Sequence, residues 1–298
     1  MSKIRYFDIA WLSKLDGPGT RLVVFFQGCN LKCKWCHSPQ SWNTYSPVLL
    51  NKLNCKFCGI CETICRNGVH KLENGNHILN VQNCTSCGKC VEACTATSPH
   101  SRKGALILPT EEIEVSELFK LIFPQLKILK RSGGITLSGG EALFQYKAVK
   151  ELLKLCKKSG IHTCIESNGL LPLENYNHVS EFVDYWLIGI RGVDQTSPKL
   201  LKLSETIQFL SSLNKDIMVR FPVVCGYTDS KDQLETTKKL MKDFSLPYIQ
   251  LLPYNNHTSH YYEAMNLPFE LNGDPSPSQE LLEKIKKFFQ DSNIATIL

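Results

Sequence analysis

The sequence predicts an α/β fold in which an incomplete (β/α)6 TIM-like barrel is interrupted by a small cysteine-rich insert. Two observations support this prediction. After residue 104, short apolar segments rich in β-forming residues alternate with helical segments, which is typical of βαβ units in a parallel sheet. In addition, eleven of the fourteen cysteines lie between residues 29 and 94. The 298 residues are enough for one large α/β domain and a small one.

The first expected strand, residues 21–27, is well defined because positions 22–26 are all apolar, as in a buried strand. A polar turn, DGPG, precedes it. Further strands are expected at residues 135–138, 162–166, 186–190, 217–224 and 248–252. Helices are expected at residues 113–123, 146–159, 198–213, 230–244 and 276–290, with Pro124 ending the first. Six such strands fit an incomplete barrel with its active site at their C-terminal ends.

Three cysteines follow the first expected strand directly: Cys29, Cys33 and Cys36, in the spacing C-x3-C-x2-C. Three thiolates can bind one face of a cubane 4Fe–4S cluster and leave one iron open for a small ligand. A partial zinc site is the alternative, but zinc motifs more often contain C-x2-C pairs with a second pair later in the chain. The spacing therefore favours an iron–sulfur cluster with an open iron.

Residues 38–104 differ in composition from the rest of the chain and contain one cysteine pattern twice. The pattern C-x2-C-x2-C-x3-C begins at Cys55 and again at Cys84, so each cysteine recurs 29 residues later. It resembles the pattern of bacterial ferredoxins, in which the fourth cysteine ligates the other cluster. This resemblance assigns one 4Fe–4S cluster to Cys55, Cys58, Cys61 and Cys94, and a second to Cys84, Cys87, Cys90 and Cys65. We expect a ferredoxin-like insert at 38–104 and a barrel formed by 1–37 and 105–298.

Composition argues against several other classes of protein. The N-terminal segment has no signal-peptide core, and no apolar run approaches the length of a membrane span. We therefore expect a cytoplasmic protein, in which many cysteines indicate metal binding rather than disulfides. The formal net charge is +6, but no basic block with interleaved aromatic residues indicates nucleic-acid binding. The predicted clusters would lower this charge to about +1, and the remaining basic surface suits an acidic electron donor.

Several motifs around the three-cysteine loop together resemble the glycyl radical enzyme activating enzymes, a family of radical S-adenosylmethionine (SAM) enzymes. These motifs are DGPGTR at residues 16–21, Phe25, QGC at 27–29, and CHSP at 36–39. Ser38 stands where the family most often has Asn. The short spacing of the chain is most similar to that of the YjjW-type members.

The resemblance implies a radical SAM barrel with three 4Fe–4S clusters and bound SAM. Such an enzyme cleaves SAM reductively to a 5′-deoxyadenosyl radical, which abstracts a Cα hydrogen from a glycine of a partner enzyme. Glycine suits this step because no side chain blocks close approach. The resemblance also implies flavodoxin or ferredoxin as the electron donor. We expect a monomer without nucleic-acid or membrane partners.

The same resemblance assigns contacts with SAM to residues at the ends of the expected strands. Gly139, Gly140 and Glu141 fit the motif that binds the methionyl amine. Glu166 and Ser167 begin the motif ESNG, where the family usually has Asp in the first position. Further contacts are assigned to Trp35, Arg220 and His257, and Asp16 is assigned to the incoming glycine loop.

One expected strand departs from the family. Residues 188–191 read IGIR where the family generally has LDIK, so Gly189 replaces the acid and Arg191 replaces the lysine. The missing carboxylate puts any cation site there in doubt, whereas the fork of Arg191 can hold the SAM carboxylate through two hydrogen bonds. Two alternatives stay open: another radical SAM enzyme acting on a peptide or small molecule, and an electron-transfer iron–sulfur protein without SAM cleavage.

Overall fold

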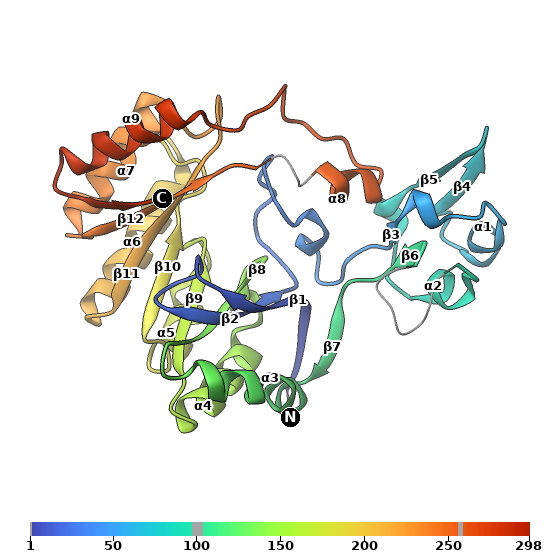
Figure 1. Ribbon diagram of the computed structural model, residues 1–298, viewed down its shortest axis with the longest axis horizontal. Coiled ribbons are helices and arrows are strands. Elements are labelled where there is room, and N and C mark those ends of the chain that lie inside the picture. Colours follow the sequence, from blue (N-terminus) through green and yellow to red (C-terminus); the bar gives the residue numbers. More distant parts are fainter. Residues whose placement is uncertain (1, 97–103, 256–258) are drawn as a thin grey trace.

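The computed structural model describes residues 2–96, 104–255 and 259–298. Its largest part is a nine-stranded sheet in the order β13-β12-β11-β10-β9-β8-β2-β1-β7 (Figure 1). The six expected strands are confirmed, and each pairs in parallel with the next. They are β2 (Thr20–Phe26), β8 (Gly133–Gly139), β9 (His162–Ser167), β10 (Tyr185–Gly189), β11 (Asp216–Val223) and β12 (Tyr248–Pro253). Within the described residues, β13 and β7 are the two edges, so the fold is a partial barrel.

Three strands of this sheet were not expected from the sequence. The short strand β13 (Ala295–Ile297) extends the parallel part beyond β12. On the other side, β1 (Lys3–Ser13) runs antiparallel to β2, and β7 (Glu111–Glu114) runs antiparallel to β1. Strands β1 and β7 contain several charged and exposed residues, and β13 is only three residues long, so none of them has the continuous apolar run that marks a buried strand.

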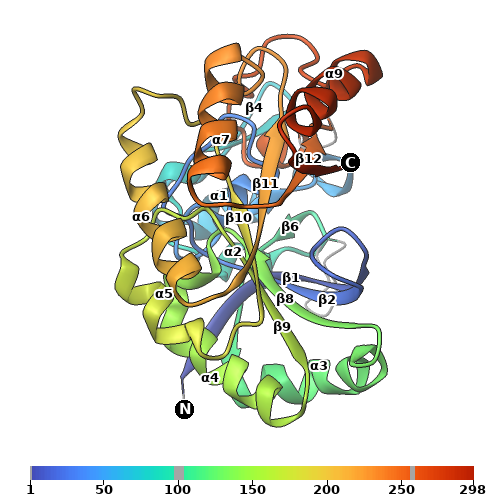
Figure 2. The same cartoon turned by 90° about the vertical axis from the view of Figure 1, so that its left-hand side faces the viewer.

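Helices flank the sheet and pack on it with apolar side chains (Figure 2). Four agree with the sequence prediction to within three residues: α4 (Tyr146–Lys158), α6 (Pro198–Ser212), α7 (Lys231–Asp243) and α9 (Gln279–Gln290). Two short helices were not expected, α5 (Leu173–Ser180) and α8 (Ser259–Ala264). In the described part of the chain, no helix has the length and apolar character needed to cross a membrane.

The prediction that Pro124 ends a helix was wrong. Helix α3 (Val115–Leu129) contains Pro124 in its interior and continues for five more residues. Its residues Leu118, Ile122, Leu126 and Leu129 are buried in the main core, and their spacing of four, four and three keeps them on one face. Proline in a helix interior costs about 3 kcal/mol, and burying two further leucines after Pro124 offsets a cost of that size.

The insert forms a small lobe to the right of the barrel in Figure 1. Its elements are β3 (Leu49–Leu50), α1 (Ile60–Ile64), β4 (His70–Glu73), β5 (Asn76–Leu79), α2 (Lys89–Ala93) and β6 (Leu106–Ile107). Strand β3 pairs with β6, and β4 with β5. A separate apolar cluster forms its core: Val48, Leu50, Cys61, Val69, Leu79, Cys90 and Leu106. The limits 38–104 stay a prediction, although Leu106 also packs in this core.

Candidate active site

The three-cysteine loop leaves the C-terminal end of β2 and is held there by backbone hydrogen bonds. Gly28 N–H donates to Ser41 O at 3.0 Å, and Cys29 N–H donates to Trp42 O at 3.3 Å. Within the loop, Cys36 N–H donates to Cys33 O at 3.0 Å. The loop therefore has a fixed path at the end of the barrel where the other strands also terminate.

The three thiols have the surroundings expected of cluster ligands. Leu31 N–H donates to the Cys29 sulfur, and Ser38 N–H donates to the Cys36 sulfur, both at 3.4 Å. Burial raises the pKa of Cys29 to about 12 and that of Cys36 to about 11, although these N–H groups lower both values. Without metal the thiols are protonated at neutral pH, and iron binding displaces the protons. The donor set fits a 4Fe–4S cluster with three protein ligands.

Gly139 and Gly140 position this loop through close contact with its backbone. Gly140 N–H donates to Phe26 O, and Glu141 N–H donates to Gly28 O, both at 2.8 Å. A side chain at position 139 would lie 2.1 Å from Phe26 N, and one at position 140 would lie 2.3 Å from Gly28 O. Both positions therefore require glycine because β8 ends directly against the start of the cysteine loop. Their contact with SAM stays a prediction.

The side chain of Glu141 is buried and links the ends of β8 and β9. It accepts hydrogen bonds from Asn168 N–H at 2.8 Å, from the Ser167 hydroxyl at 3.1 Å and from Leu143 N–H at 3.3 Å. Burial raises the pKa of Glu141 to about 7, and these donors oppose the rise. Its main-chain N–H donates to Gly28 O, and its carbonyl accepts from Phe144 N–H at 3.0 Å. Glu141 therefore fixes the ends of β8 and β9, and its contact with SAM stays a prediction.

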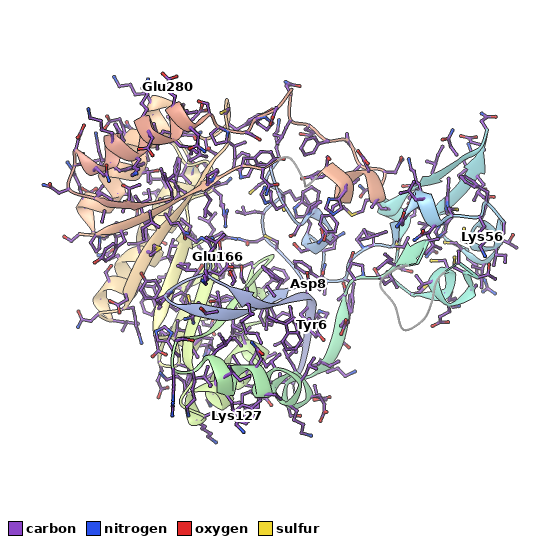
Figure 3. All side chains as sticks on the ribbon, viewed as in Figure 1. Tyr6, Asp8, Lys56, Lys127, Glu166 and Glu280 are labelled. Atoms are coloured by element: carbon purple, nitrogen blue, oxygen red, sulfur yellow. The ribbon has the colours of Figure 1, made fainter. Side chains whose placement is uncertain are left out.

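Glu166 is the centre of an ion-pair network at the end of β9 (Figure 3). Its carboxylate pairs with Arg191 and Arg220, each at 3.0 Å, and accepts a hydrogen bond from the Ser138 hydroxyl at 2.7 Å. Burial alone would raise the pKa of Glu166, but the two guanidinium groups hold it below its ordinary value. Arg220 also pairs with Asp16 at 3.1 Å. The network thus joins residues from β8, β9, β11 and the DGPG turn.

Asp16 has partners for both carboxylate oxygens. One oxygen pairs with Arg220, and the other accepts a hydrogen bond from the Ser13 hydroxyl. Its side chain is 19% exposed. The predicted contact with a glycine loop is untested, and such a loop would meet a carboxylate that is already fixed in place.

Arg21 is a buried residue of this site whose role the sequence did not reveal. Its side chain donates to the Thr136 hydroxyl at 2.6 Å, to Pro18 O at 2.9 Å and to Ile135 O. Thr136 in turn donates to Asp16 O at 2.6 Å. Arg21 therefore holds the DGPG turn on the barrel and so positions Asp16. The sequence signals were its place at the end of the DGPGTR motif and directly before a continuous apolar strand.

The departure at Gly189 and Arg191 has a structural explanation. A side chain added at position 189 would lie 2.7 Å from the Arg191 Nε atom, so the guanidinium group occupies the space that an acid at 189 would need. The positive charge of Arg191 also acts on Cys33, whose pKa burial raises and Arg191 lowers. Arg191 thus lies between Glu166 and the cysteine loop, where its predicted contact with the SAM carboxylate remains a hypothesis.

Trp35, a further predicted contact with SAM, packs in an apolar cluster beside the cysteine loop. The ring of Trp35 lies 6.2 Å from that of Tyr227, measured between centroids, and packs beside Val224, Tyr254 and Leu271. His257 lies outside the described residues. Sequence reasoning missed Tyr262 of α8, whose hydroxyl donates to Cys36 O at 3.2 Å. It therefore supports the last cysteine of the loop.

The eight cysteines of the insert divide into the two expected sets of four. Cys55, Cys58, Cys61 and Cys94 line one small cavity, and Cys65, Cys84, Cys87 and Cys90 line another. The backbone repeats as well, because Phe57 and Ser86, 29 residues apart, have φ values of 52° and 57°. Each cavity thus brings together three thiols of one repeat and one of the other, a donor set that fits a 4Fe–4S cluster.

A partial barrel whose strand ends hold a three-thiol loop for an open-iron cluster defines a radical SAM enzyme. Residues 15–218 match a family model described as "4Fe-4S single cluster domain". The chain is 32% identical to the trans-4-hydroxy-L-proline dehydratase activating enzyme of Clostridioides difficile, over 94% of each chain. It is 30% identical to the choline trimethylamine-lyase activating enzyme of Oleidesulfovibrio alaskensis, over 95% of this chain and 94% of that one.

The chain belongs to the family of glycyl radical enzyme activating enzymes. It is a radical SAM oxidoreductase of this family. Among solved structures, a domain of pyruvate-formate lyase-activating enzyme from Bacteroides vulgatus covers 55% of this chain and 98% of its own, with 20% identity and a TM-score of 0.43. The family assignment rests on the sequence relatives and not on this structural likeness.

Proposed function

We propose that this chain uses three 4Fe–4S clusters and SAM to place a radical on one glycine of a partner glycyl radical enzyme. When bound, the open-iron cluster supplies an electron to SAM, and the resulting 5′-deoxyadenosyl radical removes the glycine Cα hydrogen. The observation that carries the proposal is the convergence of the three-cysteine loop, the Gly139–Gly140 contact and the Glu166 network at one end of the barrel.

The residues around the loop would bind SAM and exclude competing reactions. Cys29, Cys33 and Cys36 would hold the cluster and leave one iron for the amine and carboxylate of SAM. Arg191 would hold that carboxylate while Glu166 fixes its guanidinium group from the other side. Trp35 would help to close the site against water, because its ring already packs in an apolar cluster.

The insert would carry electrons to the loop through two further clusters. Cys58 and Cys87 are exposed, so a protein donor can come close to either cluster from solvent. We propose flavodoxin or ferredoxin as this donor, a monomeric state for the activase, and the cytoplasm as its location, since its thiols need a reducing compartment.

SAM cleavage tests the proposal first. The full chain, reconstituted anaerobically with iron and sulfide and then reduced, is expected to convert SAM into 5′-deoxyadenosine. Cys33→Ser should abolish the product, whereas Cys225→Ser, at a thiol outside the three cluster sets, should not. Product formation by Cys33→Ser, or none by the parent protein with its clusters assembled, would contradict the proposal.

Radical transfer tests it second. The reduced activase, SAM and a candidate glycyl radical enzyme are mixed, and electron paramagnetic resonance (EPR) is expected to record a glycyl doublet. Replacing the target glycine of the partner by alanine should remove the doublet without stopping 5′-deoxyadenosine formation. A radical on a peptide or small molecule instead would support the other radical SAM reaction.

A further inference from the structure

Two buried histidines lie between the two cysteine cavities of the insert. His70 begins β4, and His77 lies on the paired strand β5. Only 4% and 3% of their surfaces are exposed. Their rings contact each other through His70 Nδ1 and His77 Nε2, which are 3.0 Å apart. This distance is that of a hydrogen bond between two imidazoles.

Each histidine faces a different cavity. His77 lines the cavity of Cys55, and its Nδ1 atom lies 3.4 Å from the Cys55 sulfur. His70 lines the cavity of Cys84. The second ring nitrogen of His70, Nε2, is buried and has no hydrogen-bond partner in the described part of the chain. The pair therefore spans the space between the two proposed cluster sites.

In a neutral pair, one ring nitrogen of each histidine is used in the contact between the rings. Of the two remaining nitrogens only one carries a proton, so the pair can donate an N–H to only one of the two cavities. If His77 carries its proton on Nδ1, it donates to the Cys55 sulfur and accepts at Nε2 from His70 Nδ1–H. In the other arrangement, His77 Nε2–H donates to His70, and the His77 Nδ1 lone pair faces a sulfur that carries negative charge once iron is bound. His70 Nε2 has no partner in either arrangement, so the contact with the Cys55 sulfur decides between them. The first arrangement satisfies both contacts and is the one that we assign.

The contact between the rings fixes how the facing nitrogens share a proton. A distance of 3.0 Å between His70 Nδ1 and His77 Nε2 requires a donor on one side and an acceptor on the other, so these two atoms hold one proton between them.

We propose that His77 donates its Nδ1–H to the Cys55 sulfur, with His70 fixing that tautomer, and so raises the reduction potential of the Cys55 cluster. This rests on the proposed function, because it requires two clusters in the insert. Reduction adds negative charge to a cluster, and an N–H donor to a ligand sulfur stabilises the reduced form. The Cys84 cluster receives no N–H from the pair, so the two clusters differ although their ligand sets repeat.

A mononuclear metal site is the competing explanation. Ligand atoms of Cys61, His70 and His77 lie within 4.8 Å of one another, as for a single bound ion. Such an ion would remove Cys61 from the four thiols that line its cavity. It would also leave the contact between His77 Nδ1 and the Cys55 sulfur without a role. The bridge accounts for the contacts of His77 with Cys55 and His70. Its third contact, 3.8 Å between Nε2 and the Cys61 sulfur, is with another thiol of the same set of four.

The reduction potentials of the two insert clusters test this proposal. The full chain carrying Cys33→Ser, which silences the loop cluster, is reconstituted and titrated anaerobically with EPR detection. Cys58→Ser and Cys87→Ser identify which signal belongs to which cluster. In His77→Phe, the equilibrium constant for reduction of the Cys55 cluster is expected to fall about tenfold. For a one-electron couple, this lowers the reduction potential by about 59 mV. The control His178→Phe, at a histidine on the barrel, should shift neither potential.

Three outcomes would overturn the proposal. The potential of the Cys55 cluster could stay unchanged in His77→Phe, the potential of the Cys84 cluster could fall in His70→Phe, or the parent protein could hold a zinc ion that His77→Phe loses. If His77→Phe fails to fold, the parent protein labelled with 15N only at histidine replaces it, because Val48 N–H also donates to the Cys84 sulfur and would exchange in D2O. Pulsed EPR should detect a hydrogen-bonded histidine nitrogen coupled to the Cys55 cluster and none coupled to the Cys84 cluster. Iron and sulfide analysis of the parent separates failure of this proposal from absence of the clusters.

Discussion

Arg191 and Gly189 form a matched pair, since the guanidinium group fills the space that a side chain at 189 would need. The ion pair with Glu166 holds the Arg191 guanidinium group in place, and its positive charge acts on Cys33 of the cysteine loop. From the sequence, Gly189 was interpreted as the loss of an acid and Arg191 as a lysine replaced by a residue that can still hold the SAM carboxylate. Their dependence on each other appears only when the path of the chain at the end of β10 is known.

Arg191→Ala is expected to weaken SAM binding at least about tenfold, because a hydrogen bond to a charged group is worth about 1.5–3 kcal/mol. Titration of the reconstituted protein with SAM, followed by the EPR signal of the reduced loop cluster, measures this affinity. Arg131→Ala, at a residue exposed after α3, is the matched control. Equal affinities of the two variants would rule out a role for Arg191 in binding SAM.

Glu141 predicts a pH dependence of stability. Burial raises its pKa in the folded protein from 4.5 to about 7, so the folded state binds the proton more tightly than the unfolded state. The contribution of Glu141 to the free energy of unfolding is therefore largest below about pH 4.5. It falls by about 3 kcal/mol as the pH rises to about 7. Glu141→Gln should remove this loss.

Urea unfolding of the apoprotein at pH 5 and pH 8 measures this effect. The difference in unfolding free energy between Glu141→Gln and the parent should move in favour of the variant at pH 8. Taking this difference cancels the contributions of the histidines, which titrate in the same range. A difference that is constant with pH would show that Glu141 has an ordinary pKa.

At the scale of elements, the parallel strands could be predicted because each is a short apolar run flanked by turns. Strand β1 could not, because its pairing with β2 and β7 buries only part of it. The cysteine sets followed from the 29-residue repeat together with the resemblance to bacterial ferredoxins, in which the fourth cysteine ligates the other cluster. The functions of Arg21 and Tyr262 did not, because their contacts join segments more than 100 residues apart in the sequence.

Helix α3 shows why local rules fail inside a packed core. Pro124 lacks the N–H that would bond to the carbonyl of Lys120, yet the buried stripe continues to Leu129. Pro124→Ala should restore that bond and stabilise the protein by about 2 kcal/mol, after the larger entropy of the unfolded chain is subtracted. Thermal unfolding measures the gain, with Leu121→Ala on the exposed face of α3 as the control. A lower melting temperature for Pro124→Ala would mean that the packing of α3 in the core depends on the ring of Pro124.

At the scale of the whole molecule, we propose that the barrel and the insert divide the work of the enzyme. The barrel holds the loop and the Glu166 network at its strand ends, and the insert forms a separate lobe with its own core (Figure 1). Helix α8 connects them, since it contacts β3 of the insert and its Tyr262 bonds to the backbone of the loop. The proposed electron transfer from the insert to the loop would therefore take place between parts of the protein that α8 holds together.

This division predicts how the source of electrons affects catalysis. Cys58→Ala together with Cys87→Ala removes one exposed ligand from each insert cluster and leaves the buried thiols of the core intact. With a protein donor, 5′-deoxyadenosine formation should fall more than about tenfold. With a small chemical reductant it should change little, because such a reductant can reach the partly exposed loop directly. Cys225→Ala should behave as the parent with both donors. Equal losses with both donors would mean that the insert supports the fold of the loop rather than its supply of electrons.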